Sequence, residues 1–570
     1  MLETNILEQP SLLDSMRSRG VLSLFISLML LPSASVLWIG SSQGEPFLGT
    51  ERAAEASVKT TSIIDVPEWR IGDNWNYDGY LDVADFVAGS GVSSNVQTLE
   101  GTLEVTVVDM YLMNIENDST LVYEVESIGE YESGDPISID GTNGCLYVDM
   151  DTTETIRASD LATHTQEATI DVYFDPVFFG GCSSWLRQEI GLLTVLNTYD
   201  PPLEDYDFPI RVGESWEMDY EQHLEFSGSS SYVPIPDDTS DSNTTSWEVV
   251  SQGSSGVSFP GCYPSYNITN YDSDGDEIGY NWYCPAIRGE IKSSYVQSFG
   301  FIAVHELVSY QQTERSTVVS IDIEYPLSPV DIEISAWINV SSQGQPVSGQ
   351  DLQFRYEAEQ FVQDVTTDEN GSFHLTLDTG DSPDDTVGIG ELGSHGLLAW
   401  IDNGTTEDVL GTSSLIIDSD VHEIDLVTRS EAVTVQRHRG NGTLTLDPNV
   451  GFNAVIGDTL TFSVPVLNRG LISSPPSSLR VNAPDGTVVN GYVPPLSSLE
   501  EARIELNWTV PASQSFGYVY IDFVADPEEE ISEDGNRSNN DGVFVLYIGA
   551  LPMANLLVLE KSLTLDEVSL

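Results

Sequence analysis

Basic residues, and lysine above all, are scarce in this sequence of 570 residues. The only lysines are Lys59, Lys292 and Lys561, and Lys and Arg together number 20 against 91 Asp and Glu, a formal net charge of −71. Because so negative a chain repels a phosphate backbone, we expect no nucleic acid among its partners. Dense carboxylates suit a saline medium, where salt screens their repulsion, and they equally suit a secreted protein that needs solubility.

Long apolar runs are also scarce, with one exception near the N-terminus. Residues 1–20 end in Arg17 and Arg19, and residues 21–40 carry no charge. This pattern predicts a cytoplasmic n-region at 1–20 and, at 21–40, either a cleaved signal peptide or an uncleaved transmembrane anchor helix. Residues 41–65 are polar and aperiodic, which indicates a flexible spacer. We therefore expect an extracellular, cell-surface protein, either secreted or membrane-anchored.

Cysteine is rare but even in number, which fits export. The four cysteines, Cys145, Cys182, Cys262 and Cys284, show no C-x-x-C spacing and predict two disulfides. Pairing Cys262 with Cys284 would close a hairpin and Cys145 with Cys182 a longer loop, although three pairings are open. Glycosylation sequons are frequent, at Asn117, Asn243, Asn267, Asn339, Asn370, Asn403, Asn441, Asn507 and Asn536.

Period-two alternation dominates the chain after residue 66, as in Leu103–Val107, and no long amphipathic helix interrupts it. With 46 Gly and 28 Pro as punctuation, this predicts an all-β protein of several antiparallel β-sandwich modules in tandem. Arg70–Trp75 (RIGDNW) recurs as Arg211–Trp216 (RVGESW), which indicates two repeated modules at 66–200 and 201–325. We interpret the repeated tryptophan as a core anchor, with a ligand platform as the alternative.

The third module, 326–430, contains Gly344–Gly349 (GQPVSG) and Thr366–Phe373 (TTDENGSF). These stretches resemble the carboxypeptidase-regulatory-like or transthyretin-like sandwiches of bacterial and archaeal surface proteins. That resemblance implies a tight hairpin at Asn370-Gly371, since both residues tolerate a positive φ.

The C-terminal module, 431–549, carries four ordered features: the turn Asn468-Arg469-Gly470, a strand ending near Asp526, the triplet Ile531–Glu533, and Asn539-Asn540 before a last strand. Together they resemble CARDB, the cell-adhesion-related domain of bacteria and archaea. The resemblance implies an immunoglobulin-like sandwich and a role in surface attachment. Residues 550–570 are either a tail or the start of a truncated further module.

Organised catalytic chemistry is not visible, and we expect no enzyme and no cofactor. The seven histidines are scattered, and neither His305-Glu306 nor His422-Glu423 has the second histidine of a zincin motif. Asn270, Asp272, Asp274 and Asp276 have the spacing that opens a calcium loop, but position twelve is Asn281 rather than glutamate. Asp-Gly between two short strands favours a hairpin turn, with calcium as the alternative.

The sequence therefore predicts an exported protein that acts in adhesion or extracellular binding without catalysis. Its expected partners are an extracellular protein or a glycan, and the membrane if the N-terminal segment stays uncleaved. Two alternatives remain open: a secreted carrier that holds an apolar ligand in residues 66–325, and an extracellular hydrolase. A lined cavity would favour the carrier, whereas a hydrolase needs a cleft with convergent carboxylates of raised pKa.

Overall fold

The computed structural model describes residues 58–61, 64–84, 94–115, 118–139, 141–230, 235, 237–296, 302–357, 361–380, 392–404, 408–430, 432–446 and 451–550. The expected n-region, the export segment and residues 551–570 lie outside this part. The elements within it are strands and two short 3-10 turns, which confirms the all-β class. Its residues include no helix long and apolar enough to cross a membrane. The chain divides into two compact units, 63–419 and 420–570, the second including residues 46–62.

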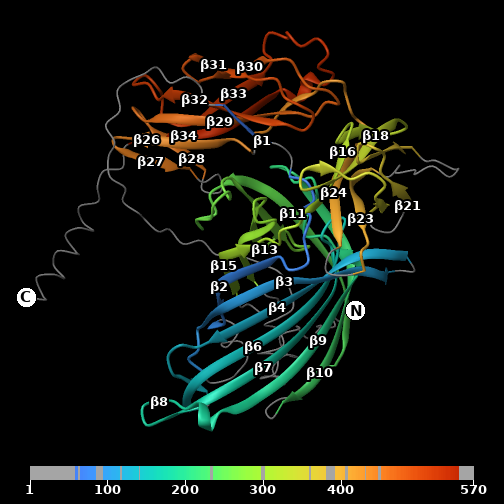
Figure 1. The fold of residues 1–570 in the computed structure, drawn as a ribbon. Helices are drawn as coiled ribbons and strands as arrows, with labels where there is room; N and C mark the ends of the chain where they lie inside the picture. Colours follow the sequence, from blue (N-terminus) through green and yellow to red (C-terminus); the bar gives the residue numbers. More distant parts are fainter. Residues whose placement is uncertain are drawn as a thin grey trace, which may run out of the picture. The chain divides into compact units, whose positions relative to one another are not determined.

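Twelve strands of the first unit form one antiparallel sheet that closes on itself (Figure 1). Each strand pairs with the next, β15 pairs back with β2, and β6 also pairs with β7. The short strands β5 (Ile137–Ile139) and β8 (Gly181–Cys182) extend the sheet beside β6 and β7. The ring consists of β2 (Asn74–Asp82), β3 (Thr98–Ile115), β4 (Asp118–Glu132), β6 (Thr142–Arg157), β7 (Thr163–Phe178), β9 (Gln188–Leu203), β10 (Ser215–Ser230), β11 (Thr239–Gly253), β12 (Ser265–Tyr271), β13 (Glu277–Cys284), β14 (Gly289–Val296) and β15 (Ile302–Gln311).

The two sequence repeats are the two halves of this ring, six strands each. In the first, the Gly72 amide donates to Val107 O at 2.7 Å; in the second, the Gly213 amide donates to Val249 O at 2.7 Å. The repeat is therefore structural. The expectation of tandem sandwiches is corrected for this region, because the halves share one sheet through the β9–β10 and β15–β2 pairs. Closure leaves neither half with an unpaired edge, which explains why they do not form separate sandwiches.

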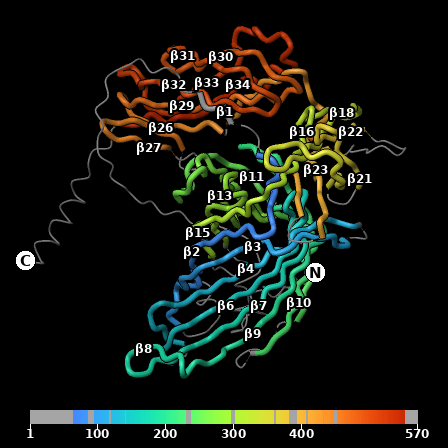
Figure 2. The backbone as a smooth tube through the Cα atoms, viewed as in Figure 1, coloured from blue at the N-terminus to red at the C-terminus, as the bar shows by residue number. Residues whose placement is uncertain are grey.

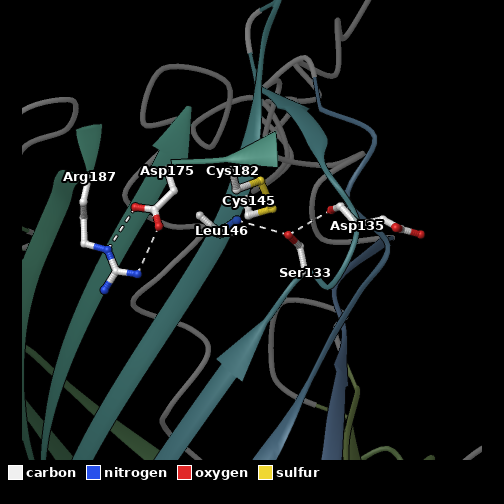
Figure 3. The surroundings of a disulfide bond; sticks show 7 residues. All are labelled: Ser133, Asp135, Cys145, Leu146, Asp175, Cys182 and Arg187. Carbon is white, nitrogen blue, oxygen red and sulfur yellow. Dashed lines mark hydrogen bonds and ion pairs between the residues drawn. A yellow bond between two sulfur atoms is a disulfide. The ribbon is translucent and has the colours of Figure 1, made fainter. Parts of the chain in front are cut away.

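The two disulfides join Cys145 to Cys182 and Cys262 to Cys284, the pairing that we favoured. The first ties β6 to β8 and lies beside an ion pair, in which the exposed Arg187 guanidinium donates to both oxygens of the buried Asp175 carboxylate at 2.9 and 3.1 Å (Figure 3). The second closes the β12–β13 hairpin. Each repeat therefore contains one disulfide of its own.

The remaining strands of the first unit form a two-sheet sandwich around the core of Ile338, Phe354 and Leu397. One sheet holds β16 (Thr317–Ile323), β18 (Glu333–Ser342), β19 (Gln345–Pro346) and β22 (Ser372–Asp378). The other holds β17 (Leu327–Pro329), β20 (Asp351–Tyr356), β21 (Phe361–Thr366), β23 (Gly393–Ile401) and β24 (Val409–Asp418). The Asn370-Gly371 turn thus joins strands of different sheets, which corrects the expected hairpin.

The second unit is also a two-sheet sandwich, traced in the smooth tube of Figure 2, with Phe462, Phe523 and Leu546 in its core. One sheet contains β1 (Val58–Thr61), β25 (Leu426–Thr428), β26 (Thr434–Arg439), β27 (Gly442–Thr445), β29 (Thr459–Asn468) and β32 (Glu501–Thr509). The other contains β28 (Phe452–Val455), β30 (Ser477–Asn482), β31 (Val488–Val493), β33 (Gly517–Ala525) and β34 (Asp541–Gly549).

Candidate functional site

A partly open cavity of about 330 Å³ lies inside the closed sheet. Residues of β2, β3, β4, β6, β7, β9, β13, β14 and β15 line it, so both repeats contribute. Alternation places every second residue inward, as Met150, Thr152, Glu154 and Ile156 of β6 show. The volume lies at the lower end of the range of small-molecule sites, about 300–1,000 Å³.

Aromatic side chains line part of the cavity, and the polar atoms of Trp69, Trp75 and Tyr77 are already hydrogen-bonded. The Trp69 indole N–H donates to Arg288 O and the Trp75 indole N–H to Ile287 O, each at 2.8 Å. The Tyr77 hydroxyl donates to Glu290 O at 3.0 Å. These bonds fix the three rings, and a ligand meets their carbon surface rather than unsatisfied donors. Trp75, from the first repeat, is therefore a core residue that also lines a cavity.

Three carboxyl groups, Glu154, Asp205 and Glu290, also line the cavity. Glu290 accepts hydrogen bonds from the hydroxyls of Tyr295 at 2.6 Å and Tyr206 at 3.1 Å. The Gln166 amide donates to Glu154 at 2.5 Å. Asp205 comes from the segment between β9 and β10, whereas Glu154 lies on β6 and Glu290 on β14. The closed sheet thus gathers acids from three distant stretches of sequence.

Burial dominates the electrostatics of these carboxyls. It raises the pKa of Asp205 to about 7, with the neighbouring Glu290 and Glu154 carboxyls adding to the shift and the Trp247 indole opposing it. Burial likewise raises the pKa of Glu154 and of Glu290. Among the described residues, no basic side chain acts to lower the pKa of any of the three.

Two basic residues, Arg288 and His305, line the cavity, but the first contacts a carboxylate outside it and the second is neutral. Arg288 bonds to the backbone carbonyl of Glu68 and lies 4.0 Å from the Glu68 carboxylate. His305 hydrogen-bonds to the Tyr131 hydroxyl at 2.8 Å, and burial lowers the pKa of its imidazole to about 4. His305 is consequently neutral near pH 7 and does not balance the carboxyls.

The predicted calcium ligands lie instead in the turn between β12 and β13. The Asp272 carboxylate accepts the backbone amides of Asp274 at 3.0 Å and Asp276 at 2.9 Å, and Asn270 is a buried residue of β12. This confirms the hairpin interpretation. Within the described part of the chain, no group of three or more His, Cys, Asp or Glu side chains could hold a metal ion.

The sequons differ in accessibility. Asn370, Asn403, Asn441 and Asn507 are exposed, whereas Asn243, Asn267, Asn339 and Asn536 are half-buried. Asn117 lies outside the described residues.

The four motif features of the C-terminal domain hold loops together. The Asn468 amide donates to Ile472 O, Leu496 O and Ser497 O at 2.8, 2.9 and 3.2 Å, and its oxygen accepts the Gly470 amide. The Asp526 carboxylate accepts the amides of Glu530 and Ile531, each at 3.0 Å. The Asn540 amide donates to Asp534 at 2.7 Å. These hydrogen bonds explain the motif structurally, since each motif residue holds a loop to the strand beside it.

A second candidate surface lies on the β33–β34 face of the C-terminal domain. Tyr518 is 74% exposed, Tyr520 62% and Tyr547 45%, and Val543 and Val545 are also exposed. Tyr518 and Tyr547 are cross-strand partners with ring centroids 5.1 Å apart. We call these five residues the tyrosine face. Contiguous exposed apolar side chains of this kind mark interaction sites.

Comparison with known proteins identifies the C-terminal domain. Residues 447–543 match the CARDB family model, which confirms the resemblance inferred from the motifs. No curated protein matches the chain. Among solved structures, the CARDB domain of a Pyrococcus furiosus protein in complex with di-metal ions is 22% identical, with 23% of this chain and 95% of that chain covered and a TM-score of 0.16.

Two further structures match at lower identity. A beta-barrel-like protein of a domain of unknown function from Brucella abortus is 11% identical over 43% of this chain and 100% of that one, with a TM-score of 0.23. A 1.5-MDa bacterial ice-binding adhesin is 8% identical over 63% of this chain and 90% of that one, with a TM-score of 0.14. The TM-scores of all three structures are low.

Proposed function

We propose that this protein is an exported, non-catalytic binding protein that holds a small ligand inside its closed sheet. The cavity of about 330 Å³ between the two repeats is the observation that carries the proposal. A filled core would have argued for a purely structural stalk. The two disulfides support an oxidising, extracellular location, since they are rare in the cytosol.

The carboxyls make catalysis an alternative function, because a hydrolase requires neighbouring acids of raised pKa. Glycoside hydrolysis, however, needs environments that push two carboxyl pKa values apart, so that one group is protonated and the other ionised. Here burial raises the pKa of all three. The shared direction of these shifts favours binding over acid–base chemistry.

Titration with the neutral fluorescent probe N-phenyl-1-naphthylamine tests the cavity proposal. The probe should bind with a fluorescence increase, and Ser127→Phe, which fills the cavity from its wall, should abolish that increase. Ser242→Phe on an exposed position of β11 is the matched control and should bind the probe like the unaltered protein. Equal binding by Ser127→Phe and the unaltered protein would show that the cavity is not the site.

Surface attachment through the C-terminal domain is a second function that the tyrosine face favours. Exposed tyrosines supply large, rigid contact area with a polar tip, which suits a protein or glycan partner. We expect the double variant Tyr518→Ser with Tyr520→Ser to reduce retention of the protein on cells of its source by about tenfold. Ser substitution of the exposed Tyr263, in the first unit, is the control, and equal retention of both variants would contradict this role.

A further inference from the structure

The cavity is lined by carboxyl groups that have no basic partner within the described part of the chain. This unbalanced charge indicates what charge a ligand would carry. Glu154, Asp205 and Glu290 act on one another electrostatically, since the Glu290 and Glu154 carboxyls both raise the pKa of Asp205. Arg288 is bonded at Glu68, and His305 is neutral above about pH 4. An ionised carboxylate in such a place is costly unless a cation accompanies it.

The cavity has room for a cation larger than a metal ion. Among the described residues, no group of three or more His, Cys, Asp or Glu side chains is placed to hold a metal ion. The cavity volume equals the share of liquid taken by about ten water molecules. A cation with a body of several non-hydrogen atoms fits a space of this size.

The aromatic lining suits the same ligand class. Trp69, Trp75, Tyr77, Tyr206 and Tyr295 line the cavity together with the acids. Indole and phenol rings attract cations through their negative faces, most strongly where water is excluded, and cages of such rings recognise ammonium groups. The net charge of −71 on the chain also raises the local concentration of cations and disfavours anionic ligands.

From this arrangement we infer that the closed sheet binds an organic cation, with an ammonium group facing Glu154, Asp205 and Glu290 and an apolar body against the aromatic lining. This inference rests on the proposed binding function and names its ligand class. The Tyr206 and Tyr295 hydroxyls that donate to Glu290 hold its carboxyl in place for the cation. Because burial raises the pKa of Asp205 to about 7, a bound cation favours the ionised form of this carboxyl, and binding below that pH releases protons.

A pair of probes that differ in charge alone tests the inference on the full chain. Choline and 3,3-dimethylbutan-1-ol have nearly the same shape, but only choline carries a charge. Each is titrated against bound N-phenyl-1-naphthylamine at about 0.5 M salt, which screens attraction to the surface. We expect choline to displace the probe at a concentration at least about tenfold lower than the alcohol.

Variants locate the effect. Asp205→Asn should remove most of the preference for choline while leaving the affinity for the alcohol within about twofold, because only a charge has been lost. Asp241→Asn, an exposed carboxylate on β11, is the control of equal charge change and should retain the preference. Glu290→Gln provides a second variant, since the amide oxygen still accepts from Tyr206 and Tyr295.

Calorimetry in two buffers of different ionisation enthalpy at about pH 6.5 measures the proton release. Choline binding should release protons, and binding of the alcohol should not. Equal displacement by choline and the alcohol, or no displacement by either while the probe binds, would overturn the inference and leave the proposed function standing. Failure of N-phenyl-1-naphthylamine itself to bind would instead remove the proposed function.

Discussion

At the scale of single residues, several carboxyl groups lie where burial disfavours their ionised form and so raises their pKa. Asp205 shows this most clearly, because its pKa of about 7 lies well above the ordinary aspartate value of about 3.9. Between these two values the folded protein binds more protons than the unfolded chain. Stability contributed by this group is therefore present below about pH 4 and is lost as the pH rises to about 7.

Replacement of this carboxyl should make the protein more stable at alkaline pH. We expect Asp205→Asn to raise the free energy of unfolding by on the order of 4 kcal/mol at pH 8, and the gain to vanish below about pH 4. Glu290 and Glu154 act on position 205 in the unaltered protein and in the variant. In both proteins they make the free energy of unfolding fall as the pH rises, because burial raises their pKa values as well. Urea unfolding across pH measures the difference, and Asp241→Asn should show no such trend. A pH-independent difference would contradict the assignment.

At the scale of elements, the repeated turn before β2 and before β10 anchors each half of the ring. Gly72 and Gly213 both adopt a positive φ, +92° and +80°, and both amides bond to the neighbouring strand. The buried Asp73 carboxylate adds a bond from the Thr313 amide at 2.7 Å, so the first turn also holds the segment after β15.

Loss of the glycine in this turn should destabilise the closed sheet. We expect Gly72→Ala to lower the free energy of unfolding by about 1–2 kcal/mol, because alanine disfavours the positive φ and its Cβ would lie 2.9 Å from Thr313 Oγ1. Gly253→Ala, where no atom lies within 4 Å of the added Cβ and φ is not positive, should change stability little. Denaturant unfolding compares the two variants. Equal losses of unfolding free energy would show that the turn does not require glycine at position 72.

At the scale of the whole molecule, the two compact units should respond separately to conditions. Both disulfides and the cavity lie in the unit at 63–419, and the C-terminal CARDB domain contains none of the four cysteines. A reductant or a bound ligand therefore acts on one unit directly.

Scanning calorimetry of the full chain should resolve this independence. We expect two unfolding transitions, of which reduction of the disulfides lowers one and N-phenyl-1-naphthylamine raises the same one, with the other unchanged within about 1 °C. A single transition, or equal displacement of both by reduction, would show that the units unfold together.

The sequence by itself determined the strands, the repeat and the CARDB domain, because each depends on local pattern, whereas the choice among three disulfide pairings came from the structure. Alternation sets which residues share a face, and motifs such as Asn468-Arg469-Gly470 build turns from their own neighbours. Glu154 is a charged residue at an inward position of an alternating strand, a pattern that the sequence itself contains.

Only the tertiary structure decided that the two repeats close into one ring and that the ring is hollow. The pairing of β15 with β2 joins residues more than two hundred positions apart, which no local pattern specifies. Alternation shows that a residue faces inward, but the space left inside depends on how all twelve strands are arranged. The placement of Glu154, Asp205 and Glu290 around one cavity follows from that closure, because the three residues come from separate stretches of the sequence.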